Sequence, residues 1–218
     1  MRTDNDLSSE SPAWTISQLR SELEHLRSRL LVVEAERNEL LREDASRYAT
    51  LHELARTDSL TGLLNRRALA ELLELECAAA ERHATTLAYA IVDVDNLKKI
   101  NDAGGHELGD QTLCRFAGVL ASNARKSDIL ARYAGDEFVL VMTRTGRLAA
   151  TKGVERIVGA LRDEHLSSSI GLAMFPADGA DPRALFAAAD RALYAAKNAG
   201  KDQYRFYEAA EGVVPTGS

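Results

Sequence analysis

The stretch Arg132–Met142, RYAGDEFVLVM, decides the fold class of this chain. Its last part, Phe138–Met142, is entirely apolar, and a short apolar run bounded by a turn predicts a buried strand. The Ala-Gly pair that ends at Gly135 predicts a tight turn, so the stretch contains the turn and second strand of a β-hairpin. The carboxylates of Asp136 and Glu137 are therefore placed where the chain enters a buried strand.

Helices and strands alternate on both sides of this hairpin. Apolar runs and turn residues predict three further strands, at residues 86–95, 167–176 and 202–207. The same signals predict a polar turn and a helix within residues 58–84, and helices at 96–105, 106–125, 147–164 and 181–200. Interleaved helices, one hairpin and several strands indicate an α/β sandwich, in which helices cover a mostly antiparallel sheet.

The composition is that of an ordinary globular protein. Of the 218 residues, 45% are hydrophobic and 28% are charged, which suits one well-packed domain and an additional segment. No apolar run approaches the ~20 residues that span a bilayer, and the acidic N-terminus is unlike a signal peptide. We therefore expect a cytoplasmic protein without a membrane segment. The net charge of −6 disfavours nucleic acid as a partner, so an anionic ligand requires a local basic pocket.

A coiled-coil pattern occupies the chain upstream of Thr57. Apolar residues follow one seam in alternating steps of three and four, and Arg37, Asp44 and Arg47 interrupt this seam. The pattern predicts a parallel coiled-coil dimer, and the alternative is a single amphipathic helix that packs on the downstream domain. The apolar seam residues are Ile16, Leu19, Leu23, Leu26, Leu30, Val33, Leu40, Leu51 and Leu54.

These patterns divide the chain into four parts. We predict a disordered N-terminus at residues 1–13, a coiled-coil dimerisation and signalling helix at 14–56, a folded α/β domain at 57–208 and a disordered tail at 209–218. A parallel dimer of the helix delivers two copies of the folded domain to the same place. We expect any regulatory signal to come from an upstream sensor protein or from the N-terminal segment itself.

Acidic residues at the end of the predicted strand 86–95 form a candidate metal site. Asp93 and Asp95 are two residues apart on a strand, so both side chains leave the same face, and the carbonyl of Val94 stays available. If the hairpin lies beside this strand, Asp136 comes next to Asp93. Oxygen ligands of this kind suit Mg²⁺ or Mn²⁺, which share their remaining positions with water and phosphates. The alternative is that these acidic residues only form solvated turns.

Backbone N–H groups and lysines in two parts of the sequence are candidates for binding phosphate. A helix is predicted to begin directly after the strand, and the backbone N–H groups of Asn96 and Leu97 at its start attract anions. Lys98 adds a positive charge on the first turn. Lys197 and Lys201, at the end of the last helix, either hold a triphosphate or only complement the helix dipole.

Asn101 and Asp110 form a candidate base-binding pair. They bracket DAGGHELG, whose glycines let the chain fold tightly, so that both side chains point at one ligand. An ionised Asp accepts hydrogen bonds only, and guanine offers two adjacent donors on its Watson–Crick edge where adenine does not. The alternative is that either residue is a turn or cap group.

Several motifs, in order, resemble those of the GGDEF domain, the catalytic unit of diguanylate cyclases. They are DSLTGLLNRR, DVDNLKKINDAGGHELGD, RYAGDEF, SIGLAMFP and ADRALYAAKNAGK, and they extend from about Thr57 to Tyr207. The resemblance implies a nucleotidyl-cyclase fold, similar to the polymerase palm, with a central antiparallel sheet. It also implies an activity, in which two facing domains each hold one GTP and the two molecules are fused into cyclic di-GMP.

The resemblance also assigns roles to individual residues. Asp93, the Val94 carbonyl and Asp136 match the metal-binding positions of the family. Glu137 is expected near the metal and the attacking hydroxyl. Lys201 stands where the family more often has Arg, so the charge is kept but a bidentate contact is lost. The remaining matches are the guanine-binding residues Asn101 and Asp110 and the phosphate-binding residues Lys98 and Lys197.

A second family site is implied by RKSD, Arg125 to Asp128. Its position resembles the RxxD site, at which cyclic di-GMP binds and inhibits the enzyme. Arg can stack on a guanine or make a bidentate contact with a phosphate, and Asp can accept from a guanine edge. The alternative is a local ion pair that joins a helix end to a strand.

One position departs from the family pattern, since Ala134 replaces the first signature glycine. An added methyl group costs little where φ is negative and about 1 kcal/mol where φ is positive. Two functional classes therefore stay open: an active diguanylate cyclase, or a catalytically silent receptor of cyclic di-GMP or GTP that signals through the coiled coil. The retained metal and guanine positions disfavour a purely structural scaffold.

Overall fold

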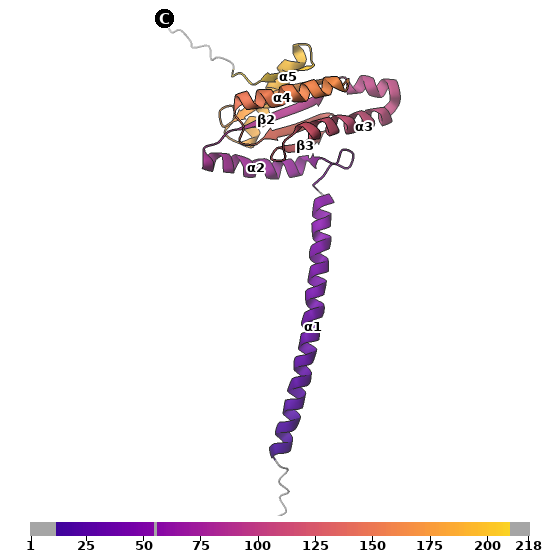
Figure 1. Ribbon diagram of the computed structural model, residues 1–218, viewed down its shortest axis with the longest axis vertical. Helices are drawn as coiled ribbons and strands as arrows, with labels where there is room; N and C mark the ends of the chain where they lie inside the picture. Colours follow the sequence, from indigo (N-terminus) through magenta and orange to yellow (C-terminus); the bar gives the residue numbers. More distant parts are fainter. Residues whose placement is uncertain (1–11, 55, 210–218) are drawn as a thin grey trace, which may run out of the picture. The chain divides into compact units, whose positions relative to one another are not determined.

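The computed structural model describes the backbone of residues 12–54 and 56–209 and the side chains of residues 16–42 and 56–209. The chain divides into two compact units, Met1–Ala55 and Arg56–Ser218 (Figure 1). The predictions of disordered termini at residues 1–13 and 209–218 fall almost entirely outside the described residues. Within the described ranges, no helix is long and apolar enough to cross a membrane.

The first unit contains one helix, α1 (Pro12–Leu54), so the predicted N-terminal helix is present. It has no glycine or proline after its first residue, which favours a continuous helix. The seam residues from Ile16 to Leu40 are 50–64% exposed in the single chain. A row of this kind is the surface that a coiled coil buries. The side chains of the later seam positions, Asp44, Arg47, Leu51 and Leu54, lie outside the described ranges.

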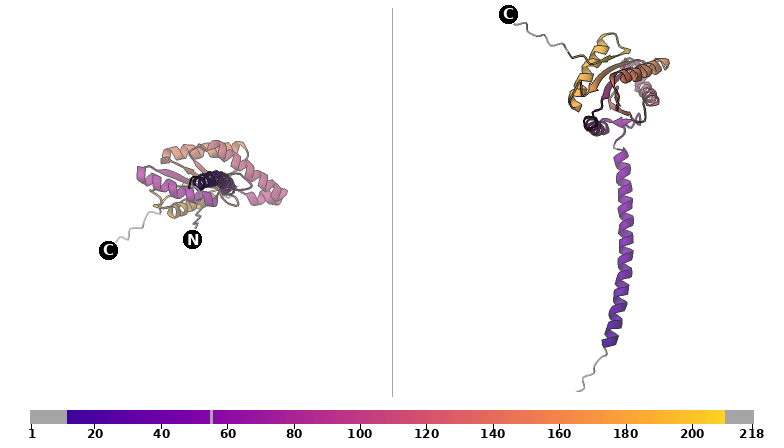
Figure 2. Two further views of the ribbon diagram at one scale, coloured as in Figure 1. Left: turned by 90° about the horizontal axis from the view of Figure 1, so that it is seen from below. Right: turned by 60° about the vertical axis from the view of Figure 1, so that its left-hand side comes forward.

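The second unit is a six-stranded sheet with helices on both faces (Figures 1 and 2). The sheet order is β1-β3-β4-β2-β5-β6. The four inner strands pair antiparallel, and the short edge strands β1 and β6 run parallel to their neighbours. The predicted α/β fold, with flanking helices on a mostly antiparallel sheet, is therefore confirmed. The elements are β1 (Leu64–Asn65), α2 (Arg66–His83), β2 (Leu87–Val94), α3 (Leu97–Asn123), β3 (Ile129–Ala134), β4 (Glu137–Met142), α4 (Arg147–Asp163), β5 (Ser168–Phe175), α5 (Pro182–Asn198) and β6 (Gln203–Phe206).

Strand β2 lies inside the sheet, and all eight of its residues are buried. Both faces are covered, which explains why this strand is a continuous apolar run instead of an alternating one. Successive side chains of a strand point to opposite faces of the sheet, so Asp93 lies on the same face as Leu87, Tyr89 and Ile91, which α2 and α5 cover. The side chains of one face pack with α3 and α4 (Ala88, Ala90 and Val92), and those of the other with α2 and α5 (Leu87, Tyr89 and Ile91).

Two glycines give the helices near the site their shape. Gly105 has φ 77° and ψ 175°, so it breaks α3 into the two helices that the sequence predicts at residues 96–105 and 106–125. Gly171 in β5 lets α5 approach the sheet, because a methyl group there would stand 2.7 Å from the Cα of Leu193. One turn after Leu193, α5 carries Lys197 over the end of β2.

Candidate functional site

The hairpin lies beside β2, as the site prediction requires. Asp93 is the partner of Glu137 in the register of β2 and β4. The backbone N–H of Val94 donates to the carbonyl of Asp136 at 3.1 Å. The end of β2 and the beginning of β4 are thereby joined, and the three predicted carboxylates, those of Asp93, Asp136 and Glu137, come from adjacent backbone positions.

The carboxylate of Asp93 is buried and bonded to a lysine. Its side chain is 9% exposed, and its Oδ2 accepts from Nζ of Lys197 at 2.7 Å. Burial and, to a smaller extent, the charges of Asp136 and Asp95 raise the pKa of Asp93 to about 6, although Lys197 favours the charged form. The repulsion between Asp93 and Asp136 is the kind that a divalent cation relieves.

Asp95 has a different role from Asp93. Its two carboxylate oxygens accept from the hydroxyl of Ser167 at 2.6 Å, from the hydroxyl of Ser169 at 2.8 Å and from the backbone N–H of Asp202 at 3.0 Å. These bonds tie the end of β2 to β5 and to the loop before β6. The expectation that Asp95 adds a free carboxylate to the metal site is therefore wrong, because its oxygens are used inside the fold.

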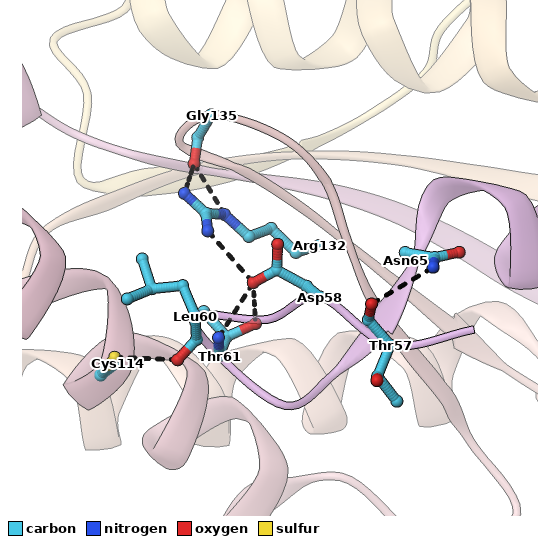
Figure 3. A network of polar contacts seen from close by, with 8 residues as sticks. All are labelled: Thr57, Asp58, Leu60, Thr61, Asn65, Cys114, Arg132 and Gly135. Atoms are coloured by element: carbon cyan, nitrogen blue, oxygen red, sulfur yellow. Dashed lines mark hydrogen bonds and ion pairs between the residues drawn. The ribbon is translucent and has the colours of Figure 1, made fainter. Parts of the chain in front are cut away.

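The turn before Asp136 is held by Arg132, as Figure 3 shows. Nε and Nη2 of Arg132 donate to the carbonyl of Gly135 at 2.9 and 2.7 Å, and Nη1 pairs with Asp58 at 3.1 Å. The same oxygen of Asp58 accepts from the backbone N–H of Thr61 at 2.9 Å and from its hydroxyl at 2.7 Å. The segment around Asp58 thus fixes the hairpin turn, and the site prediction missed both Arg132 and Asp58.

The backbone of this turn accommodates the alanine of the signature. Ala134 ends β3 with a negative φ and is exposed. Gly135 follows with φ 29°, in the region that favours glycine. Ala134 therefore introduces no backbone strain.

The segment of residues 57–65, at the N-terminal end of the folded domain, also forms hydrogen bonds with two helices (Figure 3). Asn65 caps α2 by accepting from the backbone N–H of Ala68 at 3.0 Å. The thiol of Cys114 on α3 donates to the carbonyl of Leu60 at 3.3 Å. These bonds make the segment part of the folded domain.

The predicted guanine-binding residues are brought together by the break in α3. Asn101 lies on the first part of α3, directly against Gly109, so a side chain at Gly109 would collide with the Asn101 amide. Asp110 is the next residue and is exposed. The buried Oδ1 of Asn101 has no hydrogen-bond partner within the described residues, and a donor on a ligand would satisfy it.

The predicted phosphate-binding groups surround the start of α3. Asn96 precedes this helix with φ 63° and makes no side-chain cap, so its side chain leaves the first N–H groups of the helix uncapped. Its Oδ1 instead accepts from Nζ of Lys201 at 3.0 Å. Lys98 is exposed on the first turn, next to Leu97. Lys201 therefore lies at this helix start, and Lys197 lies at Asp93.

A cleft of about 270 Å³ opens between β4 and α5. Glu137 and Lys197 line it, together with Asp190, Arg191 and Tyr194 of α5. The site prediction missed these last three residues. The feature of the sequence that could have identified them is their helical spacing, which puts them on the same part of α5 as Lys197.

Arg125 and Asp128 form a tight turn and not the alternative ion pair. The backbone N–H of Arg125 donates to Oδ2 of Asp128 at 2.9 Å, and the N–H of Asp128 donates to the carbonyl of Arg125 at 3.0 Å. The guanidinium of Arg125 has no partner among the described residues. This turn leads into β3, and the length of that strand, about 20 Å, separates it from Gly135.

The residues present fit a metal that is shared with a nucleotide. Among the described residues, no group of three or more His, Cys, Asp or Glu side chains is gathered closely enough to hold a metal ion alone. The available donors are the carboxylates of Asp93, Asp136 and Glu137 and the carbonyl of Val94. Mg²⁺ commonly takes one or two carboxylates and completes its shell with water and phosphates, so this donor set suits it.

Known proteins resemble this chain over most of its length. The family model described as diguanylate cyclase, GGDEF domain, matches residues 55–203. Diguanylate cyclase DgcP of Pseudomonas aeruginosa is 41% identical over 158 residues, which cover 68% of this chain and 23% of DgcP. Cyclic di-GMP phosphodiesterase PdeR of Escherichia coli is 35% identical over 170 residues, which cover 74% of this chain and 25% of PdeR. The chain thus spans about a quarter of the length of these relatives.

A solved structure shares the architecture as well. It contains the coiled coil and GGDEF domain of DgcB from Caulobacter crescentus in complex with c-di-GMP. It is 30% identical, has a TM-score of 0.71, and the match covers 83% of this chain and 98% of that chain. Because the family model also covers well over half of the chain, this protein belongs to the diguanylate cyclase GGDEF-domain family.

Proposed function

We propose that this protein is a diguanylate cyclase, which condenses two GTP molecules into cyclic di-GMP and two pyrophosphates at the interface of two GGDEF domains. The observation that carries the proposal is the buried carboxylate of Asp93, which lies beside Asp136 and is neutralised by Lys197. A fold gains nothing from burying a carboxylate with a raised pKa next to a second one. Such groups cluster at functional sites.

Each domain (residues 57–208) binds one GTP in this proposal. Asn101 and Asp110 bind the guanine, because a carboxylate accepts from its two adjacent donors. The phosphates lie at the start of α3, where the N–H groups of Asn96 and Leu97 and the side chains of Lys98, Lys197 and Lys201 supply positive charge.

The reaction is a phosphoryl transfer. Asp93, Val94, Asp136 and Glu137 would hold Mg²⁺ or Mn²⁺, which supplies neutralising charge for the phosphates and lowers the pKa of the attacking hydroxyl. The 3′-oxygen of one GTP bonds to the α-phosphorus of the other as the bond from that phosphorus to the pyrophosphate oxygen breaks. Glu137 is the candidate acceptor of the hydroxyl proton, because it begins β4 directly opposite Asp93. Two such transfers close the ring.

Dimerisation through α1 completes the proposed site. One domain supplies half of the reacting pair, so two domains must face each other. A coiled coil over residues 14–56 raises the effective concentration of the second half-site into the millimolar range. The polar seam residues that begin with Arg37 support a further hypothesis, in which the helix changes its packing and switches the domains between productive and unproductive facing. An upstream sensor protein is the proposed source of the signal, and the cytoplasm is the proposed location.

Incubation of the full chain with GTP and Mg²⁺, followed by chromatography for cyclic di-GMP, tests the activity. We expect product from the native chain and none from Asp136→Asn. If the variant forms cyclic di-GMP at the native rate, Asp136 is not required for the reaction. No product from the native chain, in the presence of a folded dimer, would contradict the proposal.

The second candidate is a catalytically silent receptor. One observation favours it: among the described residues, the guanidinium of Arg125 at the predicted RxxD site has no partner, so it is available to a ligand. Calorimetric titration of cyclic di-GMP into the native chain and Arg125→Ala separates the cases. Binding that needs Arg125, without turnover of GTP, indicates a receptor. Binding together with turnover indicates an enzyme with product inhibition, and we propose the latter.

A further inference from the structure

A second cleft, of about 660 Å³, lies along β6. Three arginines line it from three different elements: Arg147 at the start of α4, Arg191 on α5 and Arg205 on β6. β6 is the edge strand farthest from β1, so no further strand of residues 56–209 covers the cleft. The RxxD turn leads into β3 near the other edge, so this arginine cleft is a separate site.

The guanidinium groups of the arginine cleft are unpaired. Within the described residues, no guanidinium group of Arg147, Arg191 or Arg205 forms an ion pair or a hydrogen bond. Other exposed arginines of the same domain do find carboxylates, since Arg115 pairs with a glutamate and Arg162 with an aspartate. A chain with a net charge of −6 has carboxylates in excess, so three unpaired guanidinium groups around one cleft form a local basic pocket.

Aromatic side chains form part of the wall of the arginine cleft. The guanidinium carbon of Arg147 lies 4.2 Å from the ring centroid of Phe206. That ring packs at 88° against Tyr204, with 6.3 Å between the centroids. The cation–π contact positions the guanidinium of Arg147 but uses none of its N–H donors. Among the lining residues that the structure describes, Glu208 is the one carboxylate, so these residues carry a net positive charge.

We propose that the arginine cleft binds a nucleotide through its phosphate groups. Guanidinium groups make bidentate contacts with phosphate oxygens, and three of them can hold a di- or triphosphate. Aromatic rings and guanidinium planes are surfaces on which a base stacks. The volume lies within the range of small-molecule sites and exceeds what a single phosphate needs. This nucleotide is additional to the GTP of the proposed active site.

The arginine cleft communicates with the proposed active site through α5. Arg191 lines both this cleft and the smaller cleft at Glu137. Its helix also carries Lys197, the partner of Asp93. A phosphate bound at Arg191 therefore acts on the same helix that supplies the lysine of the active site.

Calorimetric titration of the full chain tests the proposal without turnover. The probe is a GTP analogue with a methylene group between the α- and β-phosphorus atoms, because pyrophosphate cannot leave from it. Three double variants are compared with the native chain. Arg147→Gln with Arg205→Gln disables the arginine cleft, Asn101→Ala with Asp110→Ala disables the guanine pocket, and Arg82→Gln with Arg183→Gln removes the same charge elsewhere.

We expect two binding events per chain in the native protein and in the charge control. The cleft variant loses one event, or binds it roughly tenfold or more weakly, and the guanine-pocket variant keeps that event. Inorganic tripolyphosphate competes for it, because the arginines recognise phosphate. If the double variant does not fold, Arg205→Lys serves, since it keeps the charge and loses the bidentate contact.

A single binding event in the native chain that the cleft variant retains would overturn the proposal. Equal weakening in the cleft variant and the charge control would also overturn it, because general charge attraction would then suffice. Failure of the proposed cyclase activity is distinguishable. It shows as an absence of cyclic di-GMP from ordinary GTP, whatever the calorimetry gives.

Discussion

At the scale of single residues, Asp93 is where stability and the proposed function conflict. Its pKa of about 6 lies above the ordinary value of 3.8 because burial disfavours its charge more than Lys197 favours it. Between pH 3.8 and about pH 6, the Asp93 carboxyl group is mostly protonated in the native state and mostly ionised in the unfolded chain. The contribution of Asp93 to the free energy of unfolding is therefore full below about pH 4 and is lost as the pH rises through about 6.

Asp93→Asn should stabilise the protein at neutral pH and abolish cyclase activity. The amide keeps an acceptor for Lys197 but carries no buried charge, so we expect a gain of about 1–3 kcal/mol at pH 7.5 and a clearly smaller gain at pH 4.5. Urea unfolding at the two pH values, without divalent metal, measures this difference. An identical pH dependence in the native chain and the variant would show that Asp93 does not titrate in this range.

Gly109→Ala should weaken GTP binding, because the new methyl group displaces the amide of Asn101. Gly118→Ala is the matched control, since it lies on the same helix with open space around it. Helix propensity alone favours both changes by up to about 1 kcal/mol, so any loss in the first reports the collision. We expect Gly118→Ala to be more stable with an unchanged KM, and Gly109→Ala to raise KM roughly tenfold. Equal KM values in the two variants would show that Asn101 does not take part in guanine binding.

At the scale of elements, the sequence predicts well where the strands and turns lie, but it does not predict which distant side chains contact each other. The placement of Asp93 beside the hairpin follows from strand alternation and from one turn, which are local patterns. The bond between Lys197 and Asp93 joins residues 104 positions apart, and the bond between Arg132 and Asp58 joins residues 74 apart. Such pairs depend on how α5 and the N-terminal segment pack, and no periodicity encodes them.

Asp58→Asn should loosen the hairpin turn. Burial raises the pKa of Asp58, but hydrogen bonds from Thr61 and the pair with Arg132 together bring it below 3.8. Its stabilising contribution is therefore present above about pH 4 and lost as the pH falls through the lowered value. We expect the variant to lose about 1–2 kcal/mol of unfolding free energy at pH 7 and to lower kcat.

Asp163→Asn is the control for Asp58→Asn, because Asp163 is exposed and its side chain forms no ion pair or hydrogen bond within the described residues. Urea unfolding at pH 7 and pH 3 and steady-state kinetics compare the two variants. Equal stability and kcat in both would show that the Arg132 contact does not support the turn.

At the scale of the whole molecule, the order of elements, the sheet class and the break at Gly105 are predictable from the sequence. The two-residue strand β1 is not, because it has no apolar pattern of its own and is defined by its pairing with β3 and by the bridge from Leu64 to Thr57. The coiled coil stays a prediction. The exposed seam of α1 agrees with it, but a dimer buries that seam only when a second chain is present.

Arg37→Leu should tighten the proposed dimer, because it replaces a charge in the seam with an apolar side chain. Arg42→Leu is the control, since residue 42 lies outside the seam. Sedimentation at decreasing concentration should show roughly tenfold tighter association for the first variant and little change for the second. Cyclase activity measured on the same samples tests the switching hypothesis, which predicts a changed specific activity in Arg37→Leu at full dimerisation. Unchanged association would exclude the seam as the dimer contact.

The ion pair between Lys197 and Asp93 has a consequence for the order of events. Nζ of Lys197 contacts Oδ2 of Asp93, so in the proposed cyclase a metal ion that binds this oxygen has to displace the lysine. In the same proposal, the displaced ammonium group then contacts the phosphates of GTP. The proposal thereby gives Lys197 two successive roles, as the counter-ion of Asp93 and as a phosphate-binding residue.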